Sequence, residues 1–256
     1  FRNNNGKIVQ LTTENRKAII LSNKTKTKTK AKARISDDMP RLFAYAKHDR
    51  EDTMAGKNYI ITIQRQFGSL GRPIAQKMAE LLNIKYYDRD ILDLASKEMK
   101  LAKSAIKDYD ETSYARMKHP LGLGNTKMQD YLFSVQQCII SEIATKEESC
   151  IIVGRCSDYI LRHLDNTFNI FIYAPYEARL DNCVNVLGFD AAEARTMIKQ
   201  VDKARKNYHK YYTGEAPDTI SNRQILIDSS MYGVDGTAEV LVDMVKKKFG
   251  LTDIEK

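Results

Sequence analysis

The chain has 256 residues, of which 43% are hydrophobic and 29% charged, and its formal net charge is +8. This length can bury one sizeable core, and the composition is that of an ordinary globular protein. No apolar run approaches the length that a transmembrane helix needs. The first residues lack the pattern of a signal peptide. We therefore expect a cytoplasmic protein without membrane partners.

The positive charge is concentrated at the N-terminal end. Residues 1–53 hold 13 Lys and Arg against 6 Asp and Glu, whereas the remainder holds 28 against 27. The stretch NKTKTKTKAKAR (23–34) alternates lysine with small residues, which favours disorder. We predict a basic, disordered extension over 1–53 and a folded domain over 54–256. A basic arm that binds nucleic acid is the alternative interpretation of the extension, but the near-neutral domain argues against nucleic acid as a main partner.

From residue 59 onward, strand patterns alternate with helix patterns. Apolar, β-branched runs and amphipathic segments predict the following elements in chain order: strand 59–64, helix 72–83, strand 84–88, helices 89–99 and 102–111, loop 119–127, helix 130–147, strands 149–154 and 168–174, helix 201–215 and strand 223–229. Strands that are apolar on both faces suit a parallel sheet covered by helices. The sequence therefore predicts a doubly wound α/β fold with a five-stranded parallel sheet.

The stretch IITIQRQFGSLGRPIA (60–75) has the shape of a strand, a glycine-rich loop and a helix start. Such a turn offers unpaired backbone N–H groups and the positive end of a helix dipole, which suits phosphate. The candidate phosphate-binding residues are Gln66, Phe67, Gly68, Ser69, Leu70, Gly71, Arg72 and Pro73. The strict pattern G-x-x-x-x-G-K-[ST] is broken at Gln66, Arg72 and Pro73. A tight strand–helix turn without a ligand is therefore the alternative.

Further candidates follow the other strands. Asp88 and Arg89 come after the second strand, and Gly154 and Arg155 come after the third. Ligands of open α/β sheets bind beyond the carboxyl ends of the strands, where these residues are expected to lie.

The segment VDKARKNYHKYYTGE (201–215) is a basic, aromatic helix. At helical spacing, a broad stripe is formed by Asp202, Arg205, Tyr208, Tyr211 and Tyr212. We interpret this helix as a mobile lid that brings arginine and tyrosine side chains over phosphates, or as an amphipathic helix with a solvated basic face.

No metal site is predicted from side-chain spacing. The four cysteines, at 138, 150, 156 and 183, form no C-x-x-C pair, and the histidines show no H-x-x-x-H spacing. We interpret the cysteines as reduced structural thiols, and the sequence assigns no metal ligands.

Six segments, taken in order, resemble the cytidylate kinase-like proteins of the P-loop nucleoside monophosphate kinase group. They are IITIQRQFGSLGRPIA, YYDRDIL, IIVGRCSDYIL, FIYAPYEARL, VDKARKNYHKYYTG and IDSSMYGVDGTAEVL, within residues 58–245. The resemblance implies a five-stranded parallel sheet of P-loop kinase type, an inserted helical acceptor-binding region at about 89–130 and a lid at about 188–216.

The resemblance also implies roles for particular residues. The donor ATP would lie against the loop 66–73 and, near its base, against Asp228 and Ser229. The acceptor site would be formed by Asp88, Arg89, Gly154, Arg155, Asp202, Tyr208 and Tyr212. Catalysis would rest on Arg72, Arg155, Arg205 and Asp88, with Mg²⁺ accompanying ATP.

The chain departs from the related proteins at two loop positions. They usually read S-G-G-R-E where this chain reads Ser69-Leu70-Gly71-Arg72-Pro73. Leu70 adds a side chain where a close backbone approach is expected, and the loop lacks the usual Ser/Thr ligand of magnesium.

Two functions follow from this sequence. The first is a kinase that transfers the ATP γ-phosphoryl group to a nucleoside monophosphate (CMP-like) or another small acceptor. The alternative is a catalytically weak nucleotide-binding sensor that retains the fold. Self-association into a homo-oligomer is left open.

Overall fold

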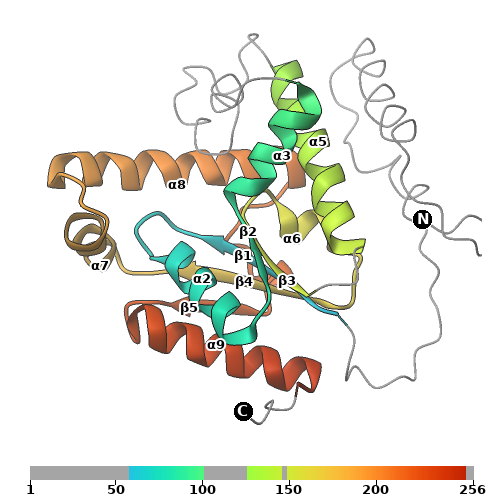
Figure 1. The fold of residues 1–256 in the computed structure, drawn as a ribbon. Coiled ribbons are helices and arrows are strands. Elements are labelled where there is room, and N and C mark those ends of the chain that lie inside the picture. Colours follow the sequence, from blue (N-terminus) through green and yellow to red (C-terminus); the bar gives the residue numbers. More distant parts are fainter. Residues whose placement is uncertain (1–57, 101–125, 146–148, 252–256) are drawn as a thin grey trace, which may run out of the picture.

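The computed structural model describes residues 58–100, 126–145 and 149–251 (Figure 1). The predicted extension 1–53, the predicted helix 102–111 and most of the predicted loop 119–127 lie outside these ranges. In the part that is described, none of the helices combines the length and apolar character needed to cross a membrane.

The centre of the fold is a parallel sheet of five strands in the order β2-β3-β1-β4-β5. The strands are β1 (Ile60–Arg65), β2 (Lys85–Tyr87), β3 (Cys150–Val153), β4 (Thr167–Tyr173) and β5 (Ile225–Asp228). In the central register Ile60 pairs with Cys150 on one side and with Thr167 on the other. The predicted five-stranded parallel sheet is confirmed.

Helices cover both faces of the sheet (Figure 1). The helical elements are α2 (Gly71–Leu82), α3 (Arg89–Met99), α5 (Thr126–Thr145), α6 (Ser157–Ile160), α7 (Tyr176–Asp181), the π-helix η3 (Asn182–Val186), α8 (Ala191–Thr213), the 3-10 turn η4 (Ile220–Asn222) and α9 (Gly233–Phe249). α2 and α9 pack together on one face, whereas α3, α5, α6 and α8 lie on the other.

The two faces carry separate hydrophobic cores because strand side chains alternate in direction. Ile61 and Ile63 of β1 contribute to the core under α2 and α9. Ile60 and β3 residue Ile152 contribute to the core under α3, α5 and α8. All six residues of β1 are buried, as expected for the middle strand of a sheet that is covered on both sides.

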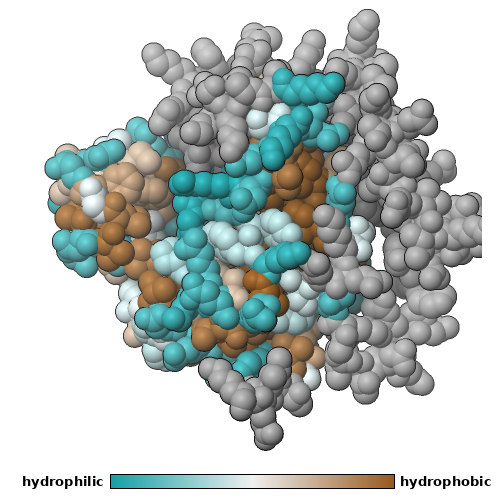
Figure 2. Space-filling model, in the orientation of Figure 1, coloured by the Kyte–Doolittle hydropathy of each residue, from teal (hydrophilic) through white to brown (hydrophobic). Residues whose placement is uncertain are grey.

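The long helix α8 begins ten residues before the predicted helix 201–215. Its start is marked by Asp190, whose side chain accepts hydrogen bonds from the backbone N–H groups of Ala192 and Glu193. Its end is marked by Gly214 in the left-handed conformation. Together with α7 and η3 it extends away from the sheet (Figure 1), and hydrophobic groups gather on the surface of this extension, where Val186 is 59% exposed (Figure 2).

Candidate functional site

The segment 66–72 joins the end of β1 to the first two residues of α2, and we call it the loop 66–72. Two of its residues have a left-handed backbone conformation. Gly68 has φ 78° and Leu70 has φ 54°. The first intrahelical hydrogen bond runs from Ile74 N–H to Leu70 O at 3.0 Å. The N–H groups of Gly71 and Arg72 therefore have no acceptor within the helix and are available to an anion at the helix N-terminus.

The loop lies where the chain changes direction across the sheet. After β1 the chain proceeds to β2 on one side, and after the neighbouring strand β4 it proceeds to β5 on the other side. Ligands of open α/β sheets bind in the crevice at such a switch point. Gln66 fixes the loop there, because its N–H donates to Ile172 O (3.0 Å) and its side-chain oxygen accepts from Ala174 N–H (3.2 Å).

Ser69 and Ser229 hold the rear of the loop. The Ser69 hydroxyl, fully buried, contacts Gln66 O at 3.0 Å and Ile172 O at 3.2 Å. The Ser229 hydroxyl donates to Ser69 O at 2.7 Å. Asp228, the other predicted contact with the donor base, accepts from the N–H and hydroxyl of Ser230. Ser229 thus supports the loop from behind.

A charged cluster lies beside the loop at the carboxyl edge of the sheet. The Arg72 guanidinium forms a hydrogen-bonded ion pair with Asp88, and Arg65 Nη2 lies 3.9 Å from the other carboxylate oxygen. Burial alone would raise the pKa of Asp88, but Arg65, Arg72 and Arg155 hold it below its usual range. The same carboxylate and burial raise the pKa of Tyr86 to about 12. Asp88 is therefore an anion surrounded by guanidinium groups.

Arg155 enters this cluster from β3 through an unusual turn. Gly154, Arg155 and Cys156 have consecutive positive φ values of 76°, 60° and 54°. Non-glycine residues in this conformation are strained by roughly 1–2 kcal/mol each, and such strain is typical of functional sites. Burial of Arg155 lowers its pKa to about 10, and the charges of Asp88, Arg65 and Arg72 also act on it. The predicted residues Arg72, Asp88 and Arg155 are thus brought together.

The residues predicted on the lid helix separate into two groups. Arg205 Nη1 donates to Arg65 O at 3.1 Å, and Asp202 Oδ1 accepts from Phe67 N–H at 2.7 Å, so both contact the loop or its approach. Tyr208 and Tyr212 instead belong to the hydrophobic core. The Tyr212 ring stacks on Phe133 at 3.9 Å.

The hydroxyl groups of these two tyrosines point toward α5. The Tyr208 hydroxyl donates to Gln136 and the Tyr212 hydroxyl to Asp130. Tyr211 is 42% exposed, and Arg89 is exposed at the start of α3. The structure does not test the predicted acceptor contacts of Arg89, Tyr208 and Tyr212, so these three stay predictions.

The described side chains offer little for direct binding of magnesium. Within residues 58–100, 126–145 and 149–251, no group of three or more His, Cys, Asp or Glu could hold a metal ion. The oxygens of Asp88 already face Arg72, Arg65 and Tyr86. Magnesium sites in kinases use one or two carboxylates together with the substrate phosphates. Asp88 as placed does not fit that role.

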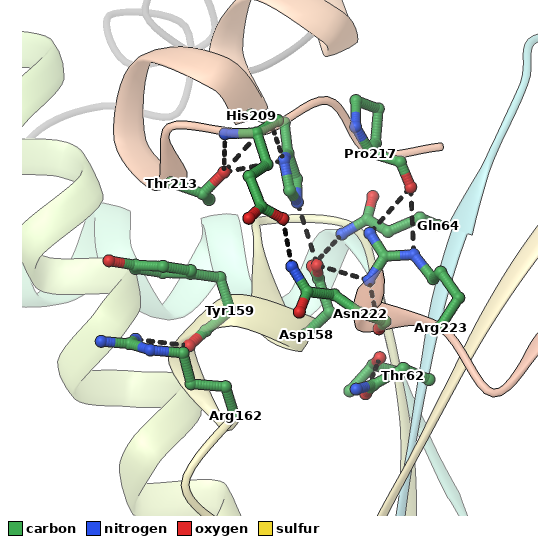
Figure 3. A network of polar contacts seen from close by, with 12 residues as sticks. Thr62, Gln64, Asp158, Tyr159, Arg162, His209, Thr213, Pro217, Asn222 and Arg223 are labelled. Carbon is green, nitrogen blue, oxygen red and sulfur yellow. Dashed lines mark hydrogen bonds and ion pairs between the residues drawn. The ribbon is translucent and has the colours of Figure 1, made fainter. Parts of the chain in front are cut away.

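A second buried network joins β1, α6, α8 and the segment that leads into β5 (Figure 3). Asp158 of α6 accepts from the Gln64 amide at 2.8 Å and lies 2.9 Å from His209 Nε2 and 2.7 Å from Arg223 Nη1. The other ring nitrogen of His209 lies 2.7 Å from Glu215 O. This network fixes the C-terminal part of α8 to the sheet.

Several of these residues were not predicted from the sequence. Arg65 ends β1, so the rule that ligands bind beyond the carboxyl ends of strands could have identified it. Tyr86 lies two residues before Asp88 on β2, which places both side chains on the same face. His209 lies 51 residues after Asp158, and Arg223 lies 14 residues after His209. No local sequence pattern predicts contacts between residues so far apart.

A sequence model of the Cytidylate kinase-like family matches residues 60–231, which include the whole sheet and the loop 66–72. The chain belongs to the cytidylate kinase-like family. The predicted resemblance is thereby confirmed.

Individual relatives of this cytidylate kinase-like protein are distant. It is 27% identical to a cytidylate kinase of Methanopyrus kandleri over 106 residues, which are 38% of this chain and 55% of that protein. The chain thus matches about half the length of this relative. The crystal structure of an uncharacterized protein from Eubacterium ventriosum superposes with a TM-score of 0.55 and 28% identity, covering 76% of this chain and 100% of the other. The two chains share the fold over that range.

Proposed function

We propose that this cytidylate kinase-like protein binds ATP at the loop 66–72 and transfers its γ-phosphoryl group to a nucleoside monophosphate, CMP-like in size, or to another small acceptor. The observation that carries the proposal is the position of the loop: it lies at the switch point between β1 and β4, beside the cluster of Arg65, Arg72, Arg155 and Asp88. The family membership supports the same reaction class.

Phosphoryl transfer depends on in-line positioning and on neutralisation of charge, both of which these residues could supply. The N–H groups of Gly71 and Arg72 would bind donor phosphate oxygens at the helix N-terminus. The guanidinium groups of Arg72, Arg155 and Arg205 would neutralise negative charge on the transferring group. Asp88 would orient these guanidinium groups. Magnesium would arrive with the ATP phosphates, because Asp88 is already engaged.

We also propose the division of the chain that goes with this reaction. Residues 54–256 would form the kinase-like domain. The region 89–130 would border the acceptor, and 188–216 would serve as the lid. The cytoplasmic location and any self-association stay predictions from the sequence.

A nucleotide-binding sensor with weak turnover is the second candidate. Leu70 takes up the left-handed conformation that glycine adopts more readily, and Pro73 stands where a hydroxyl would contact magnesium. The Arg72 side chain is also paired with Asp88, so it must rearrange or share that partner to reach a phosphate. These features favour binding over turnover.

Calorimetry of ATP binding with and without Mg²⁺, followed by transfer assays with a panel of nucleoside monophosphates on the same sample, tests the proposal. Magnesium-dependent binding with transfer to CMP or a related acceptor supports the kinase. Binding with no transfer to any acceptor supports the sensor. Absence of ATP binding overturns both.

A further inference from the structure

The outer wall of the loop 66–72 is formed by the segment that precedes and begins the lid. Three polar side chains of this segment contact the backbone of Phe67 and Gly68: Arg179 of α7, Asn182 of η3 and Asp202 of α8. We call these three residues the loop clamp. They come from three successive elements that lie more than 100 residues beyond the loop in the sequence.

The clamp bonds to three backbone groups of two consecutive loop residues, Phe67 and Gly68. Asp202 Oδ1 accepts from Phe67 N–H at 2.7 Å. Arg179 Nη1 donates to Phe67 O at 3.3 Å, and Asn182 Nδ2 donates to Gly68 O at 2.9 Å. Arg179 Nη1 also lies 2.5 Å from Asp202 Oδ2, so the two charged members of the clamp hold each other in place.

Packing at Gly68 leaves no room for a side chain. A Cβ atom at this position would lie 2.7 Å from Arg179 O and 2.9 Å from Cys183 Sγ. The ring of Phe67 packs against the small core of Cys183, Ala194 and Ile198. The π-helix carries two of the residues that contact Gly68: the Asn182 amide donates to Gly68 O, and the Cys183 sulfur lies beside the Gly68 Cα. Such π-helical turns are frequent at functional sites.

We infer that the loop clamp consists of positioning residues that preset the donor-phosphate loop, and that Asp202 is its central member. This inference rests on the proposed function in that the preset loop is the one assigned to ATP. Asp202 itself is oriented toward the loop backbone and toward Arg179, so its effect on the donor is transmitted through Phe67. Its role is to hold the loop amides and carbonyls in a fixed geometry before nucleotide arrives, which lowers the entropy cost of binding.

The test compares Asp202→Ala with Asp190→Ala in the full chain. Both variants remove one carboxylate, and the Asp190 carboxylate accepts from the N–H groups of Ala192 and Glu193 at the start of α8. Amide hydrogen exchange at Phe67 and the adjacent loop residues is measured without nucleotide, and ATP affinity is measured by calorimetry. In Asp202→Ala we expect faster exchange at Phe67 and ATP affinity that is lower by roughly 10-fold, as expected on loss of a charged hydrogen bond. Asp190→Ala removes the α8 cap and should lower the stability of the protein, but it should leave amide exchange at Phe67 unchanged.

Asn182→Ala provides a second route if Asp202→Ala fails to fold. Its control is Asn185→Ala on the same π-helix, because the Asn185 side chain donates to Asp181 Oδ1 at an exposed position. Unchanged loop exchange in both Asp202→Ala and Asn182→Ala would overturn the inference. If the unmodified protein binds no ATP, the proposed function fails, while the exchange measurement still decides whether the clamp sets the loop.

Discussion

Asp158 Oδ2 lies 2.9 Å from His209 Nε2 and 2.7 Å from Arg223 Nη1, deep in the protein. This contact joins α6, the C-terminal part of α8 and the residue that leads into β5. A carboxylate that is almost fully buried persists only with such partners. These two partners therefore make Asp158 a stabilising residue that connects the lid helix to the sheet.

We predict that Asp158→Asn lowers the free energy of unfolding by about 3 kcal/mol, because the substitution leaves a buried guanidinium without its counter-charge. Chemical denaturation at pH 7 measures the change. The control is Asp165→Asn at an exposed position nearby, which should be close to neutral. Equal effects of the two substitutions would contradict this role of Asp158.

The same contact predicts a pH dependence of stability. Burial alone would raise the pKa of Asp158, but His209 and Arg223 hold it well below its usual range. Because the folded-state pKa is depressed, the stabilisation is present above the unfolded pKa of about 4 and is lost as the pH falls below it. Unfolding measured between about pH 3 and pH 7 should therefore show a steeper acid-side loss in the unmodified protein than in Asp158→Asn. Parallel curves would contradict this.

The strands and the loop were predictable because their signals are local. Apolar β-branched runs such as YIITIQ bury both faces of a strand, and Gly68 and Gly71 mark the turn into α2. The sequence predicts Tyr208 and Tyr212 on a lid over phosphates, which the structure does not test. In the structure they lie four residues apart on one helix face and pack on Phe133. An aromatic pair at this spacing is equally typical of a buried helix face. No local sequence pattern identifies the α5 residue against which the pair packs.

Gly68→Ala is predicted to destabilise the protein by about 2–4 kcal/mol and to abolish ATP binding. Gly68 has a positive φ, and an added Cβ would lie 2.7 Å from the backbone oxygen of Arg179. Overpacking of this kind costs about 1–3 kcal/mol in addition to the conformational strain. Gly188→Ala is the matched control, since Gly188 has a similar φ of 74° but no atom within 4 Å of the added Cβ. It should show only the strain, about 1 kcal/mol.

Together, the two glycine variants separate the energetic cost of the close contact at Gly68 from the cost of the left-handed backbone conformation. Thermal or denaturant unfolding gives both stabilities, and calorimetry gives both ATP affinities. If Gly188→Ala is as damaging as Gly68→Ala, the close approach of α7 to the loop has no energetic importance.

Leu70→Gly is predicted to strengthen ATP binding. Leu70 is held at φ 54°, where a side chain is strained by about 1–2 kcal/mol, whereas glycine adopts this conformation freely at an entropic cost of about 0.5–1 kcal/mol. The unfolding free energy should therefore change by no more than about 1 kcal/mol. The substitution also removes the side chain next to the helix N-terminal amides, which gives phosphate closer access. Calorimetry with ATP checks the prediction, and weaker binding would show that the Leu70 side chain itself contacts the ligand.

Arg72→Ala is predicted to lower kcat/KM by about 100-fold, because one charged donor to the phosphates is removed. Arg72→Lys should be intermediate, since lysine keeps the charge but not the planar fork that can bridge Asp88 and a phosphate. Lys77→Ala on the same helix is the control, because Lys77 forms an exposed ion pair with Asp235 at 3.4 Å. Steady-state kinetics and calorimetry are run on all three variants. If Arg72→Ala retains full ATP affinity and turnover, Arg72 serves only to hold Asp88, and the donor site must lie elsewhere on the sheet edge.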